Sequence, residues 1–392
     1  MKSCVVVGIS GGVAAFKSVQ LVSDLVKKGY DVEVIMTKNA TQFIQPLQFE
    51  SLTQHKVMVD TFDRSFEYST EHISIAKKAD VFVIAPATAN ILSKVVHGLA
   101  DDMLSTTFLA ANCPKLLAPA MNTQMYLNPI TQDNLKLCEK YGMQLISPTC
   151  GHLACGDQGV GKMAEIDTIM EAIEMALVKD KKLANKKVLI SAGPTREALD
   201  PVRFITNHST GKMGYALARA ARNMGGDVTL VSGPVALKAP MNVTTIPVNS
   251  ASDMANAMLQ HFQEADIIIC TAAVADFTPE QVSEEKIKKE GHSLTLPLKS
   301  TTDILKTIGE QKTHQKLIGF AMESENEIEN GKKKLLSKNC DLLVVNSLRN
   351  VGAGFGCDTN IVTLLTQNEQ FDYEIMPKEE LAYIILNKAL EV

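Results

Sequence analysis

The chain has 392 residues, of which 45% are hydrophobic and 21% are charged, and its formal net charge is −5. This length favours two domains, because a single hydrophobic core rarely serves more than about 250 to 300 residues. A mildly acidic chain without a polybasic block is not expected to bind nucleic acid or an anionic membrane surface. We therefore expect local charges to decide which ligands bind.

The eight cysteines are scattered along the chain, at positions 4, 113, 138, 150, 155, 270, 340 and 357. They form no CxxC pair. Cys150 and Cys155 are the closest two, and they lack the second pair of ligands that a zinc site needs. This usage favours a reducing compartment, so we predict a cytoplasmic protein.

The first 18 residues, MKSCVVVGISGGVAAFKS, superficially look like a signal peptide, with one lysine before an apolar run. Three glycines and Ser10 interrupt that run, which then continues into an amphipathic helix pattern. We therefore predict a strand and its turn rather than a targeting segment. No apolar run reaches the length of about 18 residues that a membrane span requires, so no span is expected.

The first half of the chain alternates between strand and helix patterns. CVVVGISGG predicts a strand with a glycine turn, and Ala15, Val19, Val22 and Val26 then recur at helical spacing. Gly29 is expected to end that helix before the second strand, DVEVIMT. A further helix ending at AKKAD leads into a third apolar strand, VFVIAPATAN.

The second half repeats this organisation. KVLISAGPT predicts a strand and turn, and Met213, Leu217, Ala221 and Met224 share one face of the following helix. GGDVTLVSG and IIICTAAVAD are further strands. Two mononucleotide-type βαβ halves predict an α/β protein with two Rossmann-like (flavodoxin-like) domains, each a mostly parallel sheet flanked by helices. Neither half contains the GxGxxG fingerprint.

The halves are joined by LVKDKKLANKK, residues 177–187, which contains five lysines and few large apolar residues. This composition is typical of a helix tail followed by a linker. We place the boundary at residue 183, giving domains 1–182 and 183–392.

Several polar residues of the first half fall where strands meet helices. The GISGG turn could offer backbone N–H groups and the Ser10 hydroxyl to a phosphate, although glycine turns also serve packing alone. Thr88 and Asn90 could bind a ligand or cap the next helix. His72 could act as a general base near neutral pH, or be a solvated or capping residue.

The stretch LLAPAMNTQM ends a predicted strand in an unusual way. Pro119 stops ladder pairing and fixes the backbone, and Asn122 then offers both a donor and an acceptor. A simple loop with a capping asparagine is the alternative. Further on, the glycine-rich segment CGHLACGDQGVGKMAE, residues 150–165, predicts a hinged loop on which the Cys155 thiol could close over a substrate and donate a proton.

In this order, the motifs SGGVAAFK, EHISIA, APATANIL, APAMNTQM and GHLACGDQGVGKMAE resemble those of the homo-oligomeric flavin-containing cysteine decarboxylases. These enzymes act on 4'-phosphopantothenoylcysteine in coenzyme A biosynthesis, and the resemblance covers nearly all of residues 1–180. It implies FMN, bound by Ser10, Gly11, Gly12, Thr37, Thr88, Asn90, Ser105 and Thr106. It also implies His72 as the base at the flavin face, Asn122 as a clamp on the substrate carboxylate beside Met121, and Cys155 as the proton donor.

The reaction of such enzymes explains why a flavin, a carboxylate clamp and a proton donor are needed. Cysteine decarboxylates poorly because the resulting carbanion has no electron sink. Oxidation of the thiol by hydride transfer to flavin gives a thioaldehyde, from which CO2 can leave to give an enethiol. The hydride then returns from the reduced flavin while an acid supplies a proton, and the protein positions and protonates the reacting groups.

The second half contains a glycine turn, STGKMG, that is not a P-loop. GxxxxGK[ST] would need glycine at 206 and serine or threonine at 213, where this chain has Thr206 and Met213. The turn could still present N–H groups to a phosphate. Asp276 follows a strand and could bind a metal or a ribose, or cap a helix. Phe320 could stack on a base or lie in the core.

The second half resembles phosphopantothenate–cysteine ligase across most of residues 186–392, through SAGPTREALDPVRFITNHSTGKMG, TAAVADF, EEKIKK, GFAMES and FGCDTN. The order, decarboxylase then ligase, matches the bifunctional bacterial enzyme. The resemblance implies CTP, 4'-phosphopantothenate and cysteine as substrates, with Mg2+. The phosphopantothenate carboxylate would attack the CTP α-phosphate, giving an acyl-cytidylate and pyrophosphate, and the cysteine amine would then displace CMP.

The same resemblance assigns site residues in the second half. Asn207 would contact the acyl-cytidylate, with Arg203 nearby. The CTP site would consist of Ala272, Asp276, Lys286, Asp303, Phe320, Lys334 and Lys338, with Asp276 also a candidate Mg2+ ligand. Lysines such as Lys286, Lys334 and Lys338 are otherwise usually solvated. The family often has Asn-Pro-Asp where this chain has Thr301-Thr302-Asp303.

Two other functions compete with this interpretation. An NAD(P)-dependent oxidoreductase with two Rossmann-like domains is weakened by the missing GxGxxG fingerprint. A non-catalytic flavin-binding regulator on the same fold is weakened by the joint presence of His72 and Cys155. The resemblance further implies a homo-oligomer of trimeric decarboxylase units and dimeric ligase units, together a dodecamer.

Overall fold

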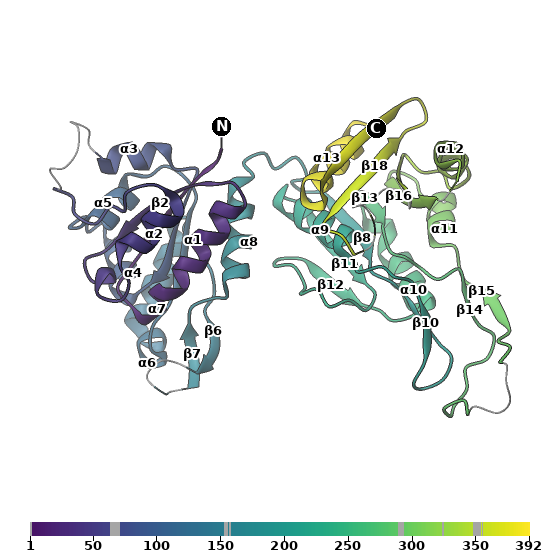
Figure 1. The fold of residues 1–392 in the computed structure, drawn as a ribbon, viewed down its shortest axis with the longest axis horizontal. Helices are drawn as coiled ribbons and strands as arrows, with labels where there is room; N and C mark the ends of the chain where they lie inside the picture. Colours follow the sequence, from purple (N-terminus) through teal and green to yellow (C-terminus); the bar gives the residue numbers. More distant parts are fainter. Residues whose placement is uncertain are drawn as a thin grey trace. The chain divides into compact units, whose positions relative to one another are not determined.

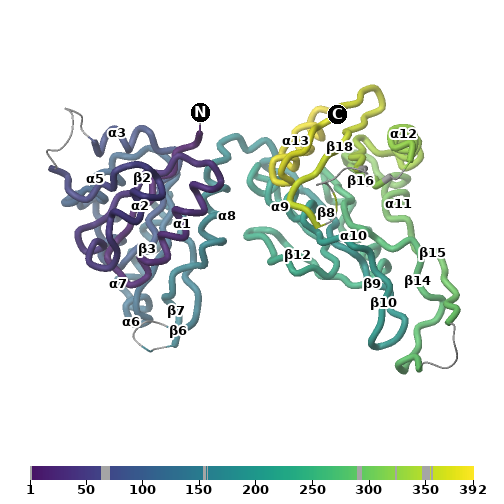
Figure 2. Tube along the Cα trace, in the orientation of Figure 1, coloured from purple at the N-terminus to yellow at the C-terminus, as the bar shows by residue number. Residues whose placement is uncertain are grey.

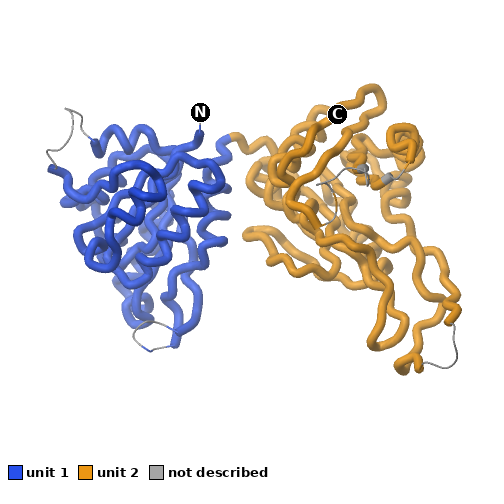
Figure 3. Tube along the Cα trace, viewed as in Figure 1, with its two compact units in different colours: residues 1–179 blue, residues 180–392 orange. Residues whose placement is uncertain are grey.

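The structure, a computed structural model, describes residues 2–62, 71–152, 156, 158–288, 294–323, 325–347, 354 and 356–392. The chain divides into two compact units, residues 1–179 and 180–392 (Figure 3). Each unit is built around its own sheet with helices on both faces (Figure 1).

The first unit contains a five-stranded, fully parallel sheet with the order β2-β1-β3-β4-β5. Its strands are β1 (Cys4–Ile9), β2 (Asp31–Met36), β3 (Val81–Ala87), β4 (Lys115–Pro119) and β5 (Gln144–Leu145). This is the flavodoxin-like order, in which the chain reverses direction across the sheet between β1 and β3.

Helices cover both faces of this sheet because its strands are apolar on both sides. β1 is buried along its whole length: Val5 and Val7 face one core, and Cys4 and Val6 face the other. One core is completed by α1 (Lys17–Lys27), α2 (Pro46–Thr53) and α8 (Ile166–Leu177). The other is completed by α3 (Glu71–Lys78), α4 (Ala89–His97), α5 (Met103–Ala110) and α7 (Pro129–Lys140).

The shorter elements of the first unit lie in its connecting segments. They are the 3-10 turns η1 (Val13–Phe16) and η2 (Ala40–Gln42), the short helix α6 (Thr123–Leu127), and the antiparallel pair β6 (Thr149–His152) and β7 (Gln158–Lys162). As predicted, α1 ends just before Gly29, whose φ of +85° lies in the left-handed region that favours glycine.

The second unit contains an eight-stranded sheet with the order β12-β11-β8-β13-β16-β17-β18-β19. Its parallel strands are β8 (Lys187–Ala192), β11 (Asp227–Ser232), β12 (Thr244–Pro247), β13 (Ile267–Cys270), β16 (Lys316–Glu323) and β17 (Leu342–Ser347). Two antiparallel strands, β18 (Thr359–Leu365) and β19 (Gln370–Pro377), extend one edge. Counted along the chain, the parallel part has the 3-2-1-4-5-6 order of dinucleotide-binding folds, with its reversal between β8 and β13.

The helices of the second unit also lie on both faces. α10 (Ala251–His261), α11 (Ile304–Gln311) and α12 (Glu327–Ser337) share a core with Leu189, Ile268 and Leu343. α9 (Lys212–Asn223) packs against α13 (Lys378–Glu391). A 3-10 turn, η3 (Phe262–Glu264), follows α10. Two small hairpins, β9 (Arg196–Ala198) with β10 (Phe204–Thr206) and β14 (Phe277–Pro279) with β15 (Leu298–Ser300), lie side by side (Figure 2).

The predicted fold class is therefore confirmed: both sheets are mostly parallel and flanked by helices. α8 ends at Leu177 and β8 begins at Lys187, so the lysine-rich stretch connects the two units. The boundary at residue 183, as a division between two activities, stays a prediction. Within the described residues, no helix combines the length and apolarity that crossing a bilayer requires.

We expect Gly309→Ala to destabilise the second unit. A Cβ at Gly309 of α11 would lie 2.0 Å from the Lys338 carbonyl oxygen, so α11 would have to move away from the end of α12. Such overpacking typically lowers the free energy of unfolding by about 1–3 kcal/mol. Calorimetry of the full chain measures this, with Lys306→Ala on the exposed face of α11 as the control. An unchanged unfolding transition would show that the two helices do not need this close contact.

Candidate functional site

The first unit has a cavity of about 1170 Å³ at the carboxyl edge of its sheet, where the strand order reverses. Cavities of this location and size are typical of ligand sites in open α/β sheets. It gathers residues from segments far apart in the sequence. The predicted residues that line it are Ser10, Gly11, Gly12, Thr37, Thr88, Asn90, Met121 and Asn122.

Ser10 ties together the two turns that form the floor of this cavity. It is 2% exposed, and its hydroxyl donates to the Pro86 carbonyl at 2.7 Å and accepts from the Thr88 N–H at 3.0 Å. Thr88 in turn caps α4, because its Oγ1 accepts a hydrogen bond from the Ile91 N–H at 3.5 Å. The capping role considered for Thr88 is therefore real, and it coexists with a position on the cavity wall.

Gly11 is required by close packing. A Cβ at this position would lie 2.5 Å from the Asn39 Cβ, so only glycine lets the turn after β1 pass the segment after β2. The backbone of the turn is thereby exposed to the cavity at the start of the η1–α1 helical stretch. Such a turn is suited to a phosphate group.

Asn122 caps a helix and lines the cavity. Its Oδ1 accepts the Gln124 N–H at 2.8 Å and so starts α6, directly after β4. The neighbouring Met121 N–H donates to the Gly161 carbonyl of β7 at 3.0 Å. These bonds fix the backbone on both sides of Asn122 at the cavity wall.

Four lysines on the wall of this cavity were missed by the sequence analysis: Lys17, Lys38, Lys94 and Lys162. Lys94 bonds to Asp101 at 2.6 Å and Asp102 at 2.8 Å. Burial lowers the pKa of Lys94, but the two carboxylates outweigh burial and raise it. Lys17 and Lys162 share the Glu165 carboxylate, at 3.9 and 3.0 Å, which leaves a net positive charge there for an anion.

Three other predicted residues do not line the cavity. Ser105 is 1% exposed and forms a capping box with Asp102, donating its N–H to Oδ1 at 2.8 Å, while the Thr106 hydroxyl donates to the Ala100 carbonyl at 3.2 Å. His72 lies half-buried in the first turn of α3. Their proposed roles stay predictions, and Cys155 lies outside the described residues.

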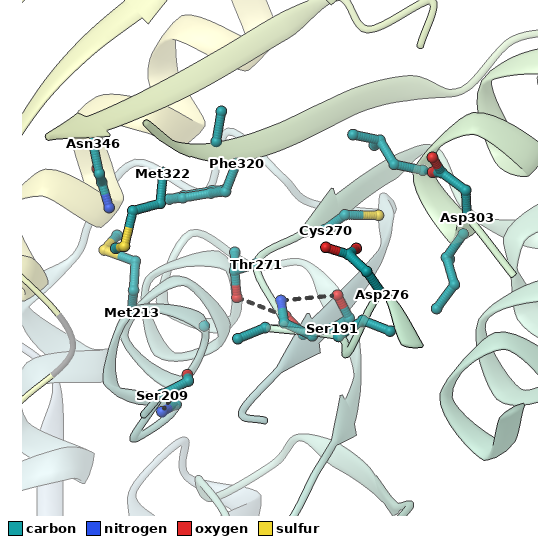
Figure 4. A pocket seen from close by; sticks show the side chains of 18 of the residues that line it. Ser191, Ser209, Met213, Cys270, Thr271, Asp276, Asp303, Phe320, Met322 and Asn346 are labelled. Carbon is teal, nitrogen blue, oxygen red and sulfur yellow. Dashed lines mark hydrogen bonds between the residues drawn. The ribbon is translucent and has the colours of Figure 1, made fainter. Parts of the chain in front are cut away.

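The second unit has a cavity of about 630 Å³ between the ends of β8 and β13, again at the reversal of strand order. The predicted residues that line it are Ala272, Asp276, Asp303, Phe320, Lys334 and Lys338. Figure 4 shows Asp276 and Asp303 on one side of this cavity and Met213, Met322 and Asn346 on the other. The floor contains Cys270, whose pKa burial raises to about 12, so it is not a thiolate near neutral pH.

The start of α9 forms one wall of this second cavity. Ser209, Thr210, Gly211, Lys212, Met213 and Gly214 all line it. Gly211 precedes the helix with φ of +77°, and a Cβ at Gly214 would lie 2.5 Å from the Ala192 Cβ. The first N–H groups of a helix lack partners within the helix, so this wall is suited to an anion. The STGKMG motif indicated the turn, but Lys212 was not singled out.

Asp303 connects the start of α11 to Lys338 on the opposite side of the second cavity. Its Oδ1 accepts the Lys306 N–H at 2.9 Å to start α11, and its Oδ2 pairs with the Lys338 ammonium. Burial raises the pKa of Asp303, but these bonds outweigh it and hold the pKa below its usual range. Thr301 anchors the same turn, since its hydroxyl donates to the Ala275 carbonyl at 2.6 Å. The Thr-Thr-Asp departure from Asn-Pro-Asp therefore keeps an ordered turn.

Asn207, Arg203 and Lys286 do not line this cavity. The Asn207 amide donates to the carbonyl of Ala273, which does line it, at 3.0 Å. Arg203 donates to the Ile287 carbonyl at 3.0 Å and so ties the β9–β10 hairpin to the segment containing Lys286. Of these three residues, Asn207 is the one bonded to a residue of the cavity wall.

Asp276 is the candidate metal ligand. Among the described residues, the three-residue group of potential metal ligands is Asp31, Glu33 and His55, in the first unit and away from either cavity. Lys78 already bonds to Asp31 and Glu33 there. Asp276 offers one carboxylate to the second cavity, and Mg2+ commonly takes one or two protein carboxylates with substrate phosphates and water.

Comparisons with known proteins match both units. The family model described as Flavoprotein matches residues 1–178, and the one described as DNA/pantothenate metabolism flavoprotein C-terminal domain matches residues 183–392. The coenzyme A biosynthesis bifunctional protein CoaBC of Bacillus subtilis (strain 168) is 47% identical over 97% of this chain and 95% of its own length. The protein of the same name from Haemophilus influenzae (strain ATCC 51907 / DSM 11121 / KW20 / Rd) is 41% identical over 99% of this chain and 97% of its own.

A third relative has a different name. A cysteine/cysteine sulfinic acid decarboxylase from an unknown prokaryotic organism is 42% identical, over 88% of this chain and 99% of its own length. Similarity of this extent therefore accompanies more than one named activity.

We expect Ser10→Ala to weaken flavin binding about tenfold or more. The substitution removes the bond to Pro86 and leaves the Thr88 N–H unpaired, a loss of about 1–3 kcal/mol for a buried group. Fluorescence titration of the flavin-free protein with FMN measures the dissociation constant. Ser51→Ala, which removes an exposed hydroxyl on α2, is the control. Equal affinities in the wild type and Ser10→Ala would show that this link does not shape the cavity.

The contribution of Asp200 to stability should depend on pH. Asp200 accepts the N–H groups of Val202 at 2.7 Å, Arg203 at 2.8 Å and Ile287 at 3.1 Å. Burial raises its pKa, but these bonds and the Arg203 guanidinium outweigh burial and lower it. A lowered folded-state pKa gives stability that is complete above the unfolded value of about 3.9 and is lost as pH falls through the folded value.

The difference in unfolding free energy between the wild type and Asp200→Asn should therefore be largest above about pH 5 and shrink below about pH 4. Urea unfolding at several pH values measures this difference. Asp227→Asn, at the exposed start of β11, is the matched control. A difference that grows toward acid pH would contradict the assigned bonds.

Proposed function

The chain belongs to the family of coenzyme A biosynthesis bifunctional proteins, and we propose that it catalyses two consecutive steps of coenzyme A biosynthesis. In the first, CTP-dependent ligation joins cysteine to 4'-phosphopantothenate through an acyl-cytidylate. In the second, FMN-dependent decarboxylation converts 4'-phosphopantothenoylcysteine into 4'-phosphopantetheine. One observation carries the proposal: each unit has its own cavity at a reversal of strand order, lined by residues assigned to a different one of these reactions.

In the first cavity, FMN supplies the two-electron chemistry that converts the substrate thiol into an electron sink. The turn from Ser10 to Gly12 would hold the flavin phosphate, with Thr88 and Asn90 on the adjoining wall. The Asn122 amide would donate to the substrate carboxylate, because its Oδ1 is already used to start α6. Cys155 would then donate the proton that completes the product.

His72 would act from a neighbouring copy of the chain. It does not line the cavity of its own unit, so a trimer in which FMN lies between subunits would give it access to the flavin. Exposed apolar side chains on the first unit, including Phe16, Leu47 and Ile130, are consistent with such contacts. Val202, Phe204 and Phe277 on the hairpins of the second unit fit the dimeric contact proposed for the ligase.

In the second cavity, the CTP polyphosphate would bind the N–H groups at the start of α9, beside Lys212. Phe320 would face the base, and Lys334 and Lys338 would bind the nucleotide from α12 and its end. Asp276 would hold Mg2+ on the phosphates. Cations arranged in advance around the reacting phosphate stabilise the charge that develops there. Asn207 would then meet the acyl-cytidylate at the rim, next to Ala273.

Decarboxylation of free cysteine is a second candidate, because one relative is named for it. The NAD(P)-dependent oxidoreductase and the non-catalytic flavin-binding regulator are not favoured, since both family models and the bifunctional relatives indicate a two-enzyme protein.

Cys155→Ser should lower decarboxylation about 10²- to 10⁴-fold, the usual range for loss of a positioned proton donor, and leave ligation unchanged. Decarboxylation is measured as CO2 release from 4'-phosphopantothenoylcysteine. Ligation is measured as CTP-dependent pyrophosphate release with 4'-phosphopantothenate and cysteine. The flavin absorbance of the purified variant reports that the first unit is folded.

Asn207→Asp should lower ligation about tenfold or more, because it replaces an amide donor with a charge that repels the acyl-cytidylate phosphate. Its decarboxylation should match that of the wild type. If either variant lost both activities while remaining folded, the assignment of one reaction to each unit would be wrong. Rapid CO2 release from free cysteine without CTP would favour the second candidate.

A further inference from the structure

Two lysines besides Lys334 and Lys338 line the second cavity, and the proposed function places only one of them, Lys212, beside the nucleotide. Lys212 is the first residue of α9, and Lys378 is the first residue of α13. Both line the cavity. They therefore bring two positive charges to one end of it.

The two helices begin at the same end because they pack together in the same direction. Arg219 of α9 pairs with Glu379 of α13, and one turn later the Asn223 Nδ2 donates to the Tyr383 hydroxyl at 2.8 Å. Helix N-termini carry partial positive charge, so a lysine at this position is electrostatically unfavourable. Each of these two lysines must therefore be held by other contacts.

Lys378 is a buried cation held by backbone carbonyls. Lys378 is 6% exposed. Its ammonium donates to the Gly354 carbonyl at 2.8 Å and to the Cys357 carbonyl at 2.6 Å. Within the described residues, no carboxylate is paired with this ammonium. Burial, and then the nearby Lys212, lower the pKa of Lys378. A buried ammonium is costly unless its hydrogen bonds are satisfied, so these two carbonyls must be held firmly in place.

Lys212 binds the same short segment from the other side. Its ammonium donates to the Gly356 carbonyl at 3.0 Å and to the Asp358 carboxylate at 2.7 Å. The Asp358 carbonyl in turn accepts the Lys378 backbone N–H at 2.9 Å. Residues 356–358 are thus bound between the two lysines. Among the residues that the structure describes, Asp358 is the one carboxylate that pairs with either lysine ammonium.

We propose that Lys378 is a positioning residue for the ligase reaction. Its ammonium fixes residues 356–358, and these residues hold the Lys212 ammonium beside the first N–H groups of α9, where the polyphosphate of the nucleotide binds. Lys378 therefore acts through Lys212 rather than by touching the substrate. The inference rests on the proposed ligase function and assigns a residue of this same cavity to the binding and release of a polyphosphate.

The test is a double-mutant cycle in the full-length protein. Lys212→Met and Lys378→Met should each raise the KM for CTP about ten- to a hundredfold, the effect of losing one hydrogen bond to a charged group. Because the two lysines act on one interaction, the double variant should be no worse than Lys212→Met alone. The KM for cysteine should stay unchanged. Lys388→Met, in the last turn of α13 and paired with Glu391, is the control.

If Lys378→Met does not fold, a second variant tests the same contact. Asp358→Asn leaves the buried lysine intact but weakens the contact that orients Lys212, so it should raise the KM for CTP and add nothing to Lys212→Met. The decarboxylase activity of the same polypeptide measures the amount of folded protein. Additive effects, or a KM for CTP that is unchanged in folded Lys378→Met, would overturn the inference.

Calorimetric titration with inorganic tripolyphosphate separates this inference from the proposed function. Binding that weakens about ten- to a hundredfold in Lys378→Met and Lys212→Met supports the inference even if no ligation is found. In that event the proposed ligase activity alone fails. Ligation in the wild type, combined with equal tripolyphosphate binding in the wild type and Lys378→Met, would refute the role of Lys378 and leave the ligase assignment standing.

Discussion

A serine hydrogen bond across the reversal of strand order holds each cavity together. In the first unit Ser10, just after β1, bonds to Pro86 and Thr88 at the end of β3. In the second unit Ser191 of β8 does the same with the end of β13: its Oγ accepts the Ala272 N–H at 3.3 Å, and its carbonyl accepts the Thr271 hydroxyl at 2.6 Å. The loops that follow parallel strands diverge at a reversal, so a bond at this point sets the width of the crevice in which a ligand can bind.

The charges follow from the same arrangement. The chain as a whole is mildly acidic, yet lysines line both cavities. Carboxylates pair with several of these lysines: Lys17 and Lys162 share Glu165, and Lys338 pairs with Asp303. Local charges of this kind can bind phosphorylated substrates, and the net charge of a chain does not reveal them.

The sequence predicted the fold well because its signals are local. Apolar strands followed by glycine turns, and helices such as the one carrying Leu217 and Ala221, are determined by periodicity along the chain. Ser10 and Thr88 were identified because they directly follow strands, whereas the strand predicted to reach Asp276 ends at Cys270. Lys17, Lys212 and Lys378 were not, because a lysine looks solvated until tertiary contacts place it on a cavity wall or, for Lys378, bury it. His72 and Arg203 do not line the cavities of their own units, so the roles assigned to them stay predictions.

The proposed function is a sequence of two reactions, in which one polypeptide joins cysteine to a phosphorylated acid and then removes the carboxyl group of that cysteine. It is tested most directly by supplying 4'-phosphopantothenate, CTP and carboxyl-labelled cysteine to the FMN-loaded protein, and by measuring CMP and labelled CO2 together. CMP and labelled CO2 should appear in equal amounts at the end of the reaction, and both should disappear when CTP is left out. CMP without CO2, or CO2 that does not depend on CTP, would contradict it.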